Sequence, residues 1–576
     1  MRGTFGGQID CAGHFTLSKS GVAILLSKEV RYILSTFSFL LCLAVTMMGK
    51  LTYLLSLSHL PLFGLATVAS DFRRSCLSFN ATSLLTNSTL RLHEHVAPNT
   101  TIPLEGMHSS CGRPNQLFTV EACRIALTVP TTNRSSVIVE LFLPPQDAWS
   151  GRYLATGNGG IDGCIKYEDI AYGISHGFAT TGSNNGHNGT GGLDFYHNED
   201  IVIDFSWRAL HTAAEVGKTL IKAFYENEIR TSFYMGCSGG GRQGVQAADL
   251  FPDDYDGVLV GAPALNFNYM SAWRSSFLTI TGSTNSSSFI KPEVWEGLIH
   301  KEILLQCEAI DGIIIEPSLC VATFRPEALL CSVHKRDDCL TVQQVEIVRK
   351  VFSPLYGVDG KMVYPPLSPG AEVLATQRLL SGTPFAYSVD WFRYAVYSDP
   401  TWDPFWFNIS DAQNAQNKNP GNAATWPADL SSFRDRGAKL LIYHGGADQQ
   451  ITGLDTERWY NHLSRGMAAR NEDLDHWMRF FRIPGMGHCS GGDGAWQIGQ
   501  SGVAARGLQY DAQHNILAAI VNWVEHDVAP DSIVGTRFVN DTVAKGVDFS
   551  REHCRYPLRS MYLGGDVGSL ENWKCK

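Results

Sequence analysis

Apolar segments of two kinds alternate along the chain from about residue 115. Short runs rich in Val, Ile and Leu predict strands at 136–143, 153–156, 231–235 and 257–260. Between them, apolar residues spaced three and four apart predict helices at 207–225 and 242–250. This alternation predicts a mostly parallel sheet with helices on both faces, which is an α/β fold.

The pattern changes between residues 267 and 428, which are rich in Ser, Asn, Pro and aromatic residues and hold four cysteines within 33 residues. We expect an irregular insertion held by local disulfides. Strand-like runs return at 439–443 and 478–483, and a helix is predicted at 510–524. The expected parts are a leader at 1–70, a first core segment at 71–266, an inserted domain at 267–435 and a second core segment at 436–576.

The N-terminal region has the features of a secretory signal. Met48-Gly49-Lys50 precedes an apolar run at 51–66, and small residues follow up to Ser70, so cleavage is expected after Ala69 or Ser70. The upstream residues contain a second apolar run at 32–46 and allow two interpretations. Translation starts at Met47 or Met48, or the long leader is a membrane anchor. We favour the first, because the later run is complete as a signal and Lys50 interrupts the longer one, whereas a spanning helix needs about 20 apolar residues.

Cysteines and glycosylation motifs also indicate export. An even number of cysteines, twelve, lies beyond the leader, which is typical of a disulfide framework. Zinc is the alternative, but no CxxC pair occurs. Eight Asn-x-Ser/Thr motifs are expected to carry glycans: Asn80, Asn87, Asn99, Asn133, Asn188, Asn285, Asn408 and Asn540. We therefore predict a secreted, extracellular protein without stable membrane association.

Charge excludes one class of partner. The formal net charge is −10, and no block of Lys or Arg stands out. A nucleic-acid partner is therefore not expected.

One glycine-rich turn carries candidate chemistry. Gly236-Cys237-Ser238-Gly239-Gly240 fits G-x-S-x-G and lies between a predicted strand and a predicted helix. That context exposes the Ser hydroxyl at the carboxyl end of the strand, as a nucleophile elbow requires. The alternative is a glycine-rich turn with an incidental serine.

A nucleophilic serine needs a base and a group that orients the base, and in this kind of fold they follow in the order Ser, Asp or Glu, His. Asp448 comes directly after the strand at 439–443, and His488 lies in a Gly-rich loop after the strand at 478–483. Both positions suit these roles. Rival acids, which have helical or inter-helical contexts, are Asp455, Asp473 and Asp475. His444 is a rival base, but it precedes the acid and lies too close to its strand end.

Two further features belong to the same predicted site. The N–H of Gly239 is expected to stabilise an oxyanion, together with an N–H of the Gly159-Gly160 turn; Gly160 is assigned as this second donor by analogy with the fold. Cys237 precedes the serine, and Cys489 follows the histidine. A bridge between them would hold nucleophile and base side by side, although cysteine partners cannot be deduced from sequence alone.

The segments 236–244 (GCSGGGRQG), 446–448 (GAD) and 484–489 (PGMGHC) resemble the fungal tannase and feruloyl esterase family. The resemblance extends from about Cys76 to Cys575 and implies an α/β-hydrolase core with a large inserted lid domain that contacts the aromatic acid. It also implies six disulfides: Cys76–Cys123, Cys111–Cys164, Cys237–Cys489, Cys307–Cys320, Cys331–Cys339 and Cys554–Cys575.

The resemblance further implies a calcium ion in the lid, bound by Asp side chains and backbone carbonyls. Here Glu308 stands where Asp is usual, Asp311 matches, and the carbonyl of Ile313 is the third candidate ligand. About four residues, including a third Asp, are missing from the family pattern. Calcium takes about six to eight oxygen ligands, so we expect this deletion to weaken any calcium site.

The function implied by the resemblance is hydrolysis of phenolic acid esters by a serine carboxylic ester hydrolase. The expected substrates are feruloyl esters of plant cell-wall polysaccharides, with galloyl esters, as for a tannase, as the alternative. Four aromatic residues of the insertion are candidates for stacking on the phenolic ring, although such residues more often belong to the core: Trp391, Phe392, Tyr394 and Trp402. A catalytically silent binding protein on a hydrolase scaffold is a third hypothesis, which the intact Ser, Asp and His disfavour.

Overall fold

A computed structural model describes residues 63–85, 87–332 and 338–576, with side chains from Asp71 onward. The chain divides into two units, Met1–Phe72 and Arg73–Lys576. Most of the predicted signal, and the upstream apolar run at 32–46, lie outside the described residues. Helix α2 (Phe63–Ser78) spans the two predicted cleavage positions.

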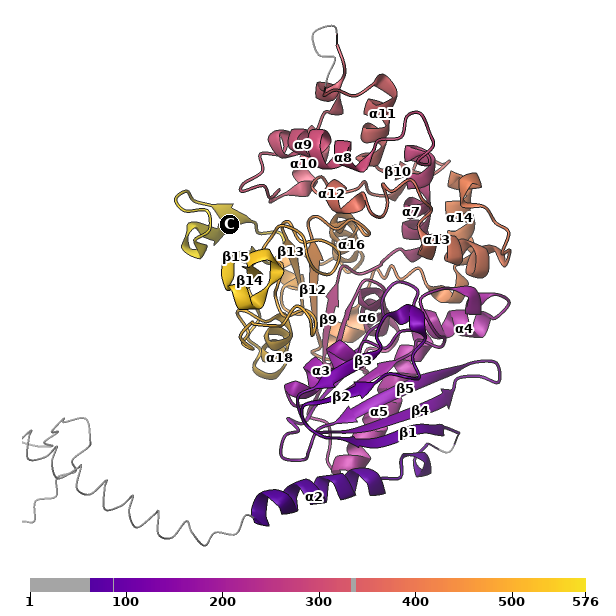
Figure 1. Ribbon diagram of the computed structural model, residues 1–576, viewed down its shortest axis with the longest axis vertical. Helices are drawn as coiled ribbons and strands as arrows, with labels where there is room; N and C mark the ends of the chain where they lie inside the picture. Colours follow the sequence, from indigo (N-terminus) through magenta and orange to yellow (C-terminus); the bar gives the residue numbers. More distant parts are fainter. Residues whose placement is uncertain (1–62, 86, 333–337) are drawn as a thin grey trace, which may run out of the picture. The chain divides into compact units, whose positions relative to one another are not determined.

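A nine-stranded sheet forms the centre of the second unit, in the order β1-β4-β5-β7-β6-β8-β9-β12-β13 (Figure 1). Its strands are β1 (Thr89–Val96), β4 (Ala122–Pro130), β5 (Ser136–Leu143), β6 (Arg152–Thr156), β7 (Phe178–Ser183), β8 (Thr231–Cys237), β9 (Gly257–Gly261), β12 (Lys439–Gly445) and β13 (Met478–Ile483). The strands from β7 to β13 are parallel, whereas β1, β4, β5 and β7 pair antiparallel. The prediction of a mostly parallel sheet is confirmed.

The parallel strands are continuous apolar runs because both of their faces are covered. Every residue of β9 is buried, and so is every residue of β12 after Lys439. Strands of a sheet that is covered on both faces have continuous apolar sequences, whereas a half-exposed strand alternates between apolar and polar residues. Strand β1 lies at an edge and shows mostly exposed or half-buried positions.

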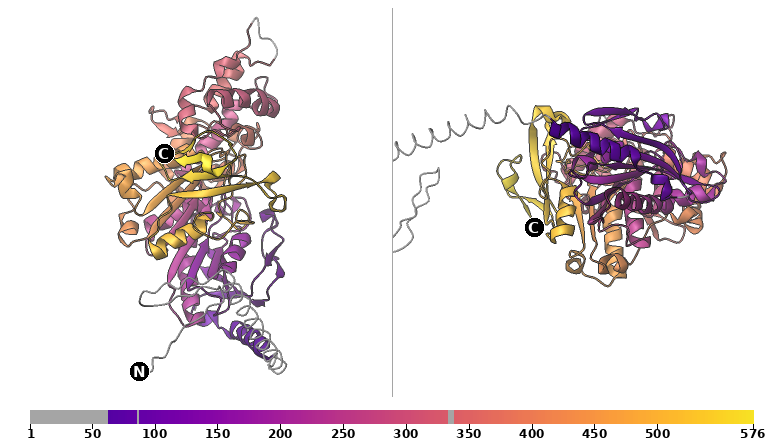
Figure 2. Two further views of the ribbon diagram at one scale, coloured as in Figure 1. Left: turned by 90° about the vertical axis from the view of Figure 1, so that its left-hand side faces the viewer. Right: turned by 90° about the horizontal axis from the view of Figure 1, so that it is seen from below.

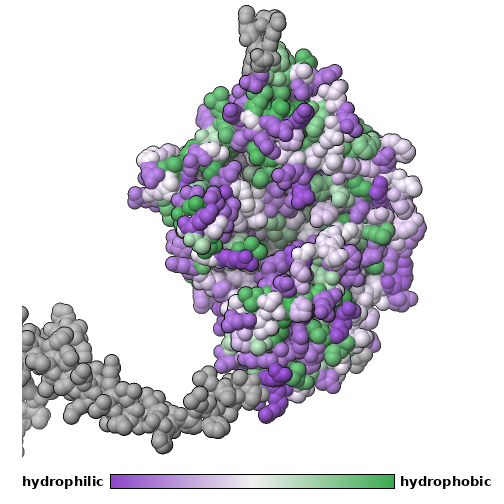
Figure 3. Space-filling model, in the orientation of Figure 1, coloured by the Kyte–Doolittle hydropathy of each residue, from purple (hydrophilic) through white to green (hydrophobic). Residues whose placement is uncertain are grey.

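Helices cover both faces of the sheet (Figure 2). Helices α5 (Ala209–Tyr225) and α6 (Gly239–Leu250) contact β7, β8 and β9 on one face. On the other face, α18 (Ile516–His526) shares a buried core with Phe233, Leu259 and Leu441. Polar and apolar residues are interspersed over the surface seen in Figure 3.

The chain leaves the sheet after β9 and returns to it at β12, and the residues between form an insertion with its own buried core. The prediction that this insertion is irregular is wrong. Its main helices are α7 (Phe267–Thr281), α9 (His300–Gln306), α11 (Val342–Val351), α13 (Ala386–Asp390) and α14 (Ile409–Lys418). Helix α7 is buried on nearly all sides, so it lacks the apolar stripe by which a surface helix is recognised in a sequence.

Two predicted helices have different bounds in the structure. The helix predicted at 207–225 begins earlier, as α4 (Glu199–Ile203), and continues through a π-helical turn, Asp204–Arg208, into α5. The helix predicted at 510–524 begins only at Ile516, because Asn515 caps it by accepting a hydrogen bond from the N–H of Ala518.

The described residues contain six disulfides, and these confirm every pairing that the resemblance implied. Two lie within the insertion, Cys307–Cys320 and Cys331–Cys339. Cys554–Cys575 joins the end of β15 (Val547–Cys554) to the short strand β17 (Trp573–Cys575).

Candidate active site

Ser238 forms the sharp turn between β8 and α6. Its backbone has φ 65° and ψ −121°, a left-handed conformation that is rare for a residue with a side chain and is found at nucleophile elbows. Its N–H donates to the carbonyl of Gly261 at 2.9 Å, and its carbonyl accepts from the N–H of Ala264 at 3.0 Å. The turn is therefore anchored to the segment that follows β9.

His488 lies in the loop after β13 and reaches the serine. Its Nε2 lies 2.8 Å from the Oγ of Ser238, although 250 residues separate the two in the sequence. The backbone N–H of His488 donates to Oε1 of Gln449 at 2.9 Å, which ties this loop to the loop after β12.

Asp448 completes a chain of three side chains. Its Oδ2 lies 2.8 Å from Nδ1 of His488, and its Oδ1 accepts from the N–H groups of Gln450 and Ile451, each at 2.8 Å. Burial alone would raise the pKa of Asp448, but the charge of His488 and the hydrogen bonds from His444 and His488 outweigh it and hold this pKa well below its usual range. The carboxylate therefore stays ionised where an orienting group must be.

The Cys237–Cys489 disulfide joins the residues next to serine and histidine, with their Cα atoms 6.0 Å apart. It links the end of β8 directly to the loop after β13. The loops that carry Ser238 and His488 are thus held together covalently as well as by packing.

Two backbone N–H groups lie beside the serine. Gly239 is the first residue of α6, so its N–H has no acceptor within the helix, and none is present elsewhere among the described residues. Gly160 has φ 52°, and a Cβ built on Gly239 would lie 2.6 Å from the carbonyl oxygen of Gly160, so the two backbones are in direct contact. The N–H of Gly160 also has no acceptor in the described part of the chain, whereas that of Gly159 donates to Asp162.

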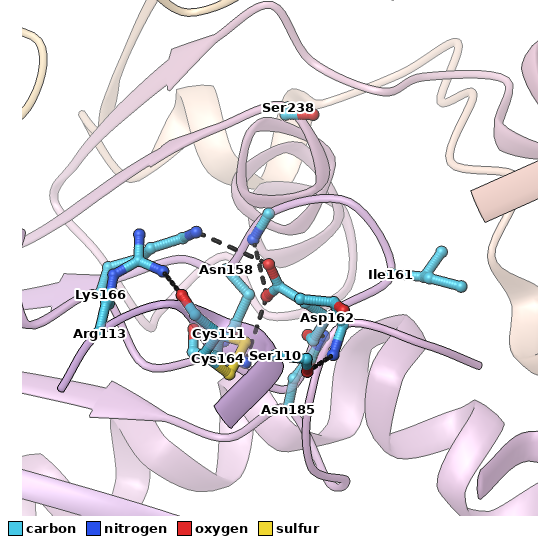
Figure 4. A network of polar contacts seen from close by, with 12 residues as sticks. Ser110, Cys111, Arg113, Asn158, Ile161, Asp162, Cys164, Lys166, Asn185 and Ser238 are labelled. Atoms are coloured by element: carbon cyan, nitrogen blue, oxygen red, sulfur yellow. Dashed lines mark hydrogen bonds and ion pairs between the residues drawn. A yellow bond between two sulfur atoms is a disulfide. The ribbon is translucent and has the colours of Figure 1, made fainter. Parts of the chain in front are cut away.

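A polar network holds the loop that carries Gly160, and Figure 4 shows it beside Ser238. Asp162 accepts from the N–H groups of Gly159 at 3.2 Å and Cys164 at 3.3 Å, and its other oxygen faces Nζ of Lys166 at 3.7 Å. Asn158 is bound from the other side by Gln243 of α6, whose Oε1 accepts the Asn158 N–H at 3.0 Å. The loop is therefore fixed to the same helix that positions Ser238.

A pocket of about 540 Å³ opens over Ser238 and His488. One wall is the loop at 157–160, and another comes from the insertion and includes Phe385 and Tyr387. The ring of Tyr387 lies 2.6 Å from the point where a Cβ on Gly160 would stand, so the aromatic wall touches the loop of the second N–H group. A concave site with aromatic walls and a few convergent polar groups is typical of a site for a small organic substrate.

Comparisons with known proteins show the family of the chain. A family model described as tannase and feruloyl esterase matches residues 123–422 and 420–576. A protein of Aspergillus flavus named probable feruloyl esterase B-2 is 50% identical over 497 residues, which cover 85% of this chain and 94% of the relative. The chain belongs to the tannase and feruloyl esterase family.

Other relatives extend the same comparison. Feruloyl esterase C of Talaromyces stipitatus is 43% identical over 511 residues, covering 88% of this chain and 95% of the relative. The crystal structure of feruloyl esterase B from Aspergillus oryzae superposes with a TM-score of 0.84 at 41% identity, covering 88% of this chain and 100% of that one. The tannin acyl hydrolase from Aspergillus niger, at 18% identity and a TM-score of 0.68, shares the fold. As a member of this family, the protein is a carboxylic ester hydrolase.

The rival acids lie in other contexts in this family member. Asp455 is buried in α16 (Gly453–Gly466) and pairs with Arg458 at 3.3 Å. Asp473 accepts the N–H of Arg470, and Asp475 pairs with Arg555. The rival base His444 is buried beside Asp448 and makes no hydrogen bond to Ser238 among the described residues.

The four candidate aromatic residues do not line this pocket, so the stacking hypothesis is wrong for them, and the alternative of a core position is confirmed for Trp391 and Phe392. Trp391 and Phe392 are fully buried in the core of the insertion, and Trp402 stacks on Phe392 with ring centroids 5.0 Å apart. Tyr394 lines a different groove. Phe385 and Tyr387 line the pocket instead of the four candidates. No local pattern in the sequence distinguishes these two residues from the aromatic residues of the core.

The candidate calcium ligands do not fit the ion. The carboxylate of Asp311 faces the guanidinium of Arg551 at 3.3 Å, and Glu308 is exposed. Ile310 and Ile313 close the turn by exchanging backbone hydrogen bonds of 3.0 and 2.9 Å, which uses the Ile313 carbonyl. A calcium site brings together about six to eight oxygens and holds no competing cation. This turn offers too few oxygens, and Arg551 is a competing cation at Asp311.

Proposed function

We propose that the protein is a feruloyl esterase in which Ser238 is the nucleophile, His488 the general base and acid, and Asp448 the group that orients His488. The observation that carries this proposal is the unbroken hydrogen-bonded chain Ser238–His488–Asp448, whose Ser238 and His488 line a pocket with an aromatic wall. Relatives that share 41 to 50% of their residues with this chain are named feruloyl esterases, which supports the substrate class.

The reaction follows from the positions of these atoms. Ser238 Oγ attacks the ester carbonyl while its proton moves to Nε2 of His488, and the carbonyl oxygen becomes an oxyanion. The N–H groups of Gly239 and Gly160 stabilise that oxyanion. When the C–O bond to the alcohol breaks, His488 returns the proton to the leaving oxygen, and the acyl group remains on Ser238.

Water then completes the cycle. His488 removes a proton from a water molecule, the resulting hydroxide attacks the acyl carbon, and the bond to Ser238 Oγ breaks as that oxygen takes the proton back from His488. The products are the free phenolic acid and the alcohol.

The pocket walls support an aromatic acyl group. Phe385 and Tyr387 offer ring surfaces in the same pocket as Ser238, and a planar hydroxycinnamoyl group would lie against them with its carbonyl at Ser238. Galloyl esters are the alternative substrates. The tannin acyl hydrolase supports only a shared fold at 18% identity, so we favour the feruloyl assignment.

We infer that the protein acts outside the cell on esters attached to plant cell-wall polysaccharide. All eight predicted glycosylation residues are exposed, and the six disulfides suit an oxidising environment. Within the described residues, no helix has the length and apolarity needed to cross a bilayer.

The test is hydrolysis of methyl ferulate, methyl caffeate, methyl gallate and a short p-nitrophenyl ester by the purified protein. The proposal predicts the highest kcat/KM on a hydroxycinnamate. A preference for the gallate would make the protein a tannase. Failure of a fluorophosphonate probe to label Ser238, together with no turnover of any ester, would support the silent binding protein instead.

A further inference from the structure

A second imidazole binds the carboxylate of the triad. His444, near the end of β12, places its Nε2 3.2 Å from Oδ2 of Asp448, the same oxygen that His488 contacts at 2.8 Å. Both His444 and Asp448 are buried, with exposed fractions of 2% and 0%. Asp448 thus lies between two imidazoles, and the reaction described above uses only one of them.

The surroundings of His444 determine which of its nitrogens carries the proton. Nε2 has two neighbours, the Asp448 carboxylate and the carbonyl of Ile451 at 2.9 Å, and both can only accept hydrogen bonds. Nε2 must therefore carry a proton and donate it. Nδ1 lies 2.8 Å from the hydroxyl of Thr456, so the orientation of the ring is fixed from both sides.

This arrangement excludes His444 as the base that activates the serine. Its Nε2 is already committed to Asp448 and Ile451, and its Nδ1 faces α16. What His444 contributes is the fourth hydrogen bond to the carboxylate, beside those from His488, Gln450 and Ile451.

We propose that His444 is a positioning residue of the catalytic site, which shares the Asp448 carboxylate with His488 and thereby fixes both the direction and the strength of the Asp448–His488 hydrogen bond. The proposal rests on the proposed function of Ser238, His488 and Asp448. Without the donor at His444, Oδ2 is held by His488 alone, and its negative charge is no longer divided between two N–H groups.

The consequence for pH dependence has a definite sign. When a carboxylate loses one hydrogen-bond donor, less of its negative charge is compensated, and it attracts the remaining donor more strongly. A nearby negative charge favours the protonated form of an imidazole. Loss of the His444 donor should therefore strengthen the attraction between the Asp448 carboxylate and a protonated His488 in the free enzyme. Because the base must be neutral to accept the serine proton, the acid limb of the kcat/KM profile should move to higher pH.

Other titratable or charged groups face this pair and must be considered. They are His488, Arg274 of α7, Tyr364 of β11 (Met362–Tyr364), and Asp455 and Glu457 of α16. Burial raises the pKa of Asp455 to about 7, although Arg458 opposes this, so Asp455 titrates in the range of interest. Measuring each variant also in an Asp455→Asn background removes that titration.

The experiment compares three substitutions on the full chain with a p-nitrophenyl ester. His444→Phe removes the donor and keeps the ring volume, His444→Asn has an amide too short to reach Asp448, and His444→Gln places an amide N–H near the position of Nε2. We expect kcat to fall about 10- to 100-fold in the first two variants with little change in KM, and the acid limb to rise by about 0.5 to 1 pH unit. His444→Gln should restore both properties towards wild type.

A buried histidine outside the site provides the matched control. His553 is 1% exposed and also donates to a carbonyl, that of Ala495 at 2.8 Å. His553→Phe should lower the melting temperature without moving the acid limb. If His444→Phe does not fold, the comparison of His444→Asn with His444→Gln carries the test alone.

Two results would overturn the proposal. One is a folded His444→Phe or His444→Asn variant with wild-type kcat and acid limb. The other is an equal loss in all three variants with an unmoved limb, which would mean that His444 only supports the fold. Following the rate of fluorophosphonate labelling of Ser238 against pH gives the same comparison without an ester, so a wrong substrate assignment would not affect it.

Discussion

At the scale of single residues, the site depends on positions where the backbone or the charge is unusual. Ser238 holds a left-handed conformation between β8 and α6, and Asp448 holds a charge with no exposed surface. Both persist because their surroundings supply specific hydrogen bonds, from Gly261 and Ala264 for the serine and from four N–H groups for the carboxylate. Substitutions at such residues should change activity or pH behaviour in defined ways.

Ser238→Ala should abolish esterase activity and leave the fold intact. Only the Oγ atom is lost, while removal of a triad member costs on the order of 10⁴- to 10⁶-fold in rate. The measurement is kcat on methyl ferulate, with the melting temperature as the check on folding. Activity above a few per cent of wild type would remove Ser238 from its assigned role.

Asp455→Asn should change how stability depends on pH. Burial raises the pKa of Asp455 to about 7, against the opposing charge of Arg458, whereas an unfolded Asp has a pKa of about 3.9. A raised pKa in the folded state favours folding at low pH, and this contribution is lost as the pH rises through about 7. Melting temperatures from pH 4.5 to 8 should therefore show the variant gaining about 2 to 4 °C on wild type as the pH rises. A difference that does not vary with pH would contradict the shift.

At the scale of elements, loops from distant parts of the chain are joined into one site. The loop after β6 carries Gly160 and is fixed to α6 through Asn158 and Gln243. The loop after β13 carries His488 and is fixed to β8 by the Cys237–Cys489 disulfide. The site therefore depends on connections between elements as much as on the three catalytic side chains.

Replacing Cys237 and Cys489 together by Ala should lower kcat more than it changes KM. Closing a loop of 252 residues is worth about 5 kcal/mol in the chain-entropy model, less where other bridges already shorten the loop. Without this bridge only packing holds His488, and a displacement of about 1 Å at a catalytic group costs on the order of 100-fold. We expect a loss of about 10- to 100-fold in kcat.

The matched control for the bridge is the pair Cys554 and Cys575, whose disulfide lies outside the pocket lining. Its double Ala variant should lose stability and keep kcat. Equal kcat losses in both double variants would argue against a specific role for Cys237–Cys489.

Gly160→Ala should impair catalysis, because Gly160 has φ 52° and a Cβ there would lie 2.6 Å from the ring of Tyr387. The loop would have to move, and with it the second oxyanion donor, whose loss costs on the order of 100- to 1,000-fold in kcat. Gly106→Ala is the control, since a Cβ on Gly106 meets no atom within 4 Å. Wild-type kcat in Gly160→Ala would assign the second donor to another residue.

At the scale of the whole molecule, the insertion separates the two halves of the core in sequence but not in space. Strands β9 and β12 pair in parallel, with Gly257 opposite Lys439, although the entire insertion lies between them. The insertion also supplies one wall of the pocket. Its stability therefore matters for substrate binding, and a metal ion within it would be detected in the unfolding of the chain.

Calcium chelation should leave the melting temperature unchanged. Asp311 is paired with Arg551, and the turn at 310–313 is closed by its own backbone hydrogen bonds, so calcium has too few free oxygens to bind. The measurement is the melting temperature with EDTA and with added calcium. A ligand that binds the native state raises the unfolding free energy by mass action, so a drop of several degrees in EDTA would reveal a calcium site.

Local features of the sequence determined the strands of the parallel sheet and the identity of the three catalytic candidates. Buried strands require continuous apolar runs, and a nucleophile elbow requires small residues around a serine between a strand and a helix. These requirements act within a few residues of one another, so they remain visible without a structure. Ser238, Asp448 and His488 each follow one of these predicted strands, in the order along the chain that this kind of fold requires.

Tertiary structure alone decided the helices of the insertion, the aromatic wall of the pocket and the role of His444. A helix buried on all sides, such as α7, shows no stripe of apolar residues. Phe385 and Tyr387 lie on the side of the insertion that lines the pocket with Ser238, whereas Trp391 and Phe392 lie in its core. His444 contacts Asp448 because the chain turns back after β12 and α16 supplies Thr456 behind the ring. Such outcomes depend on how distant surfaces pack, and no spacing within one segment records them.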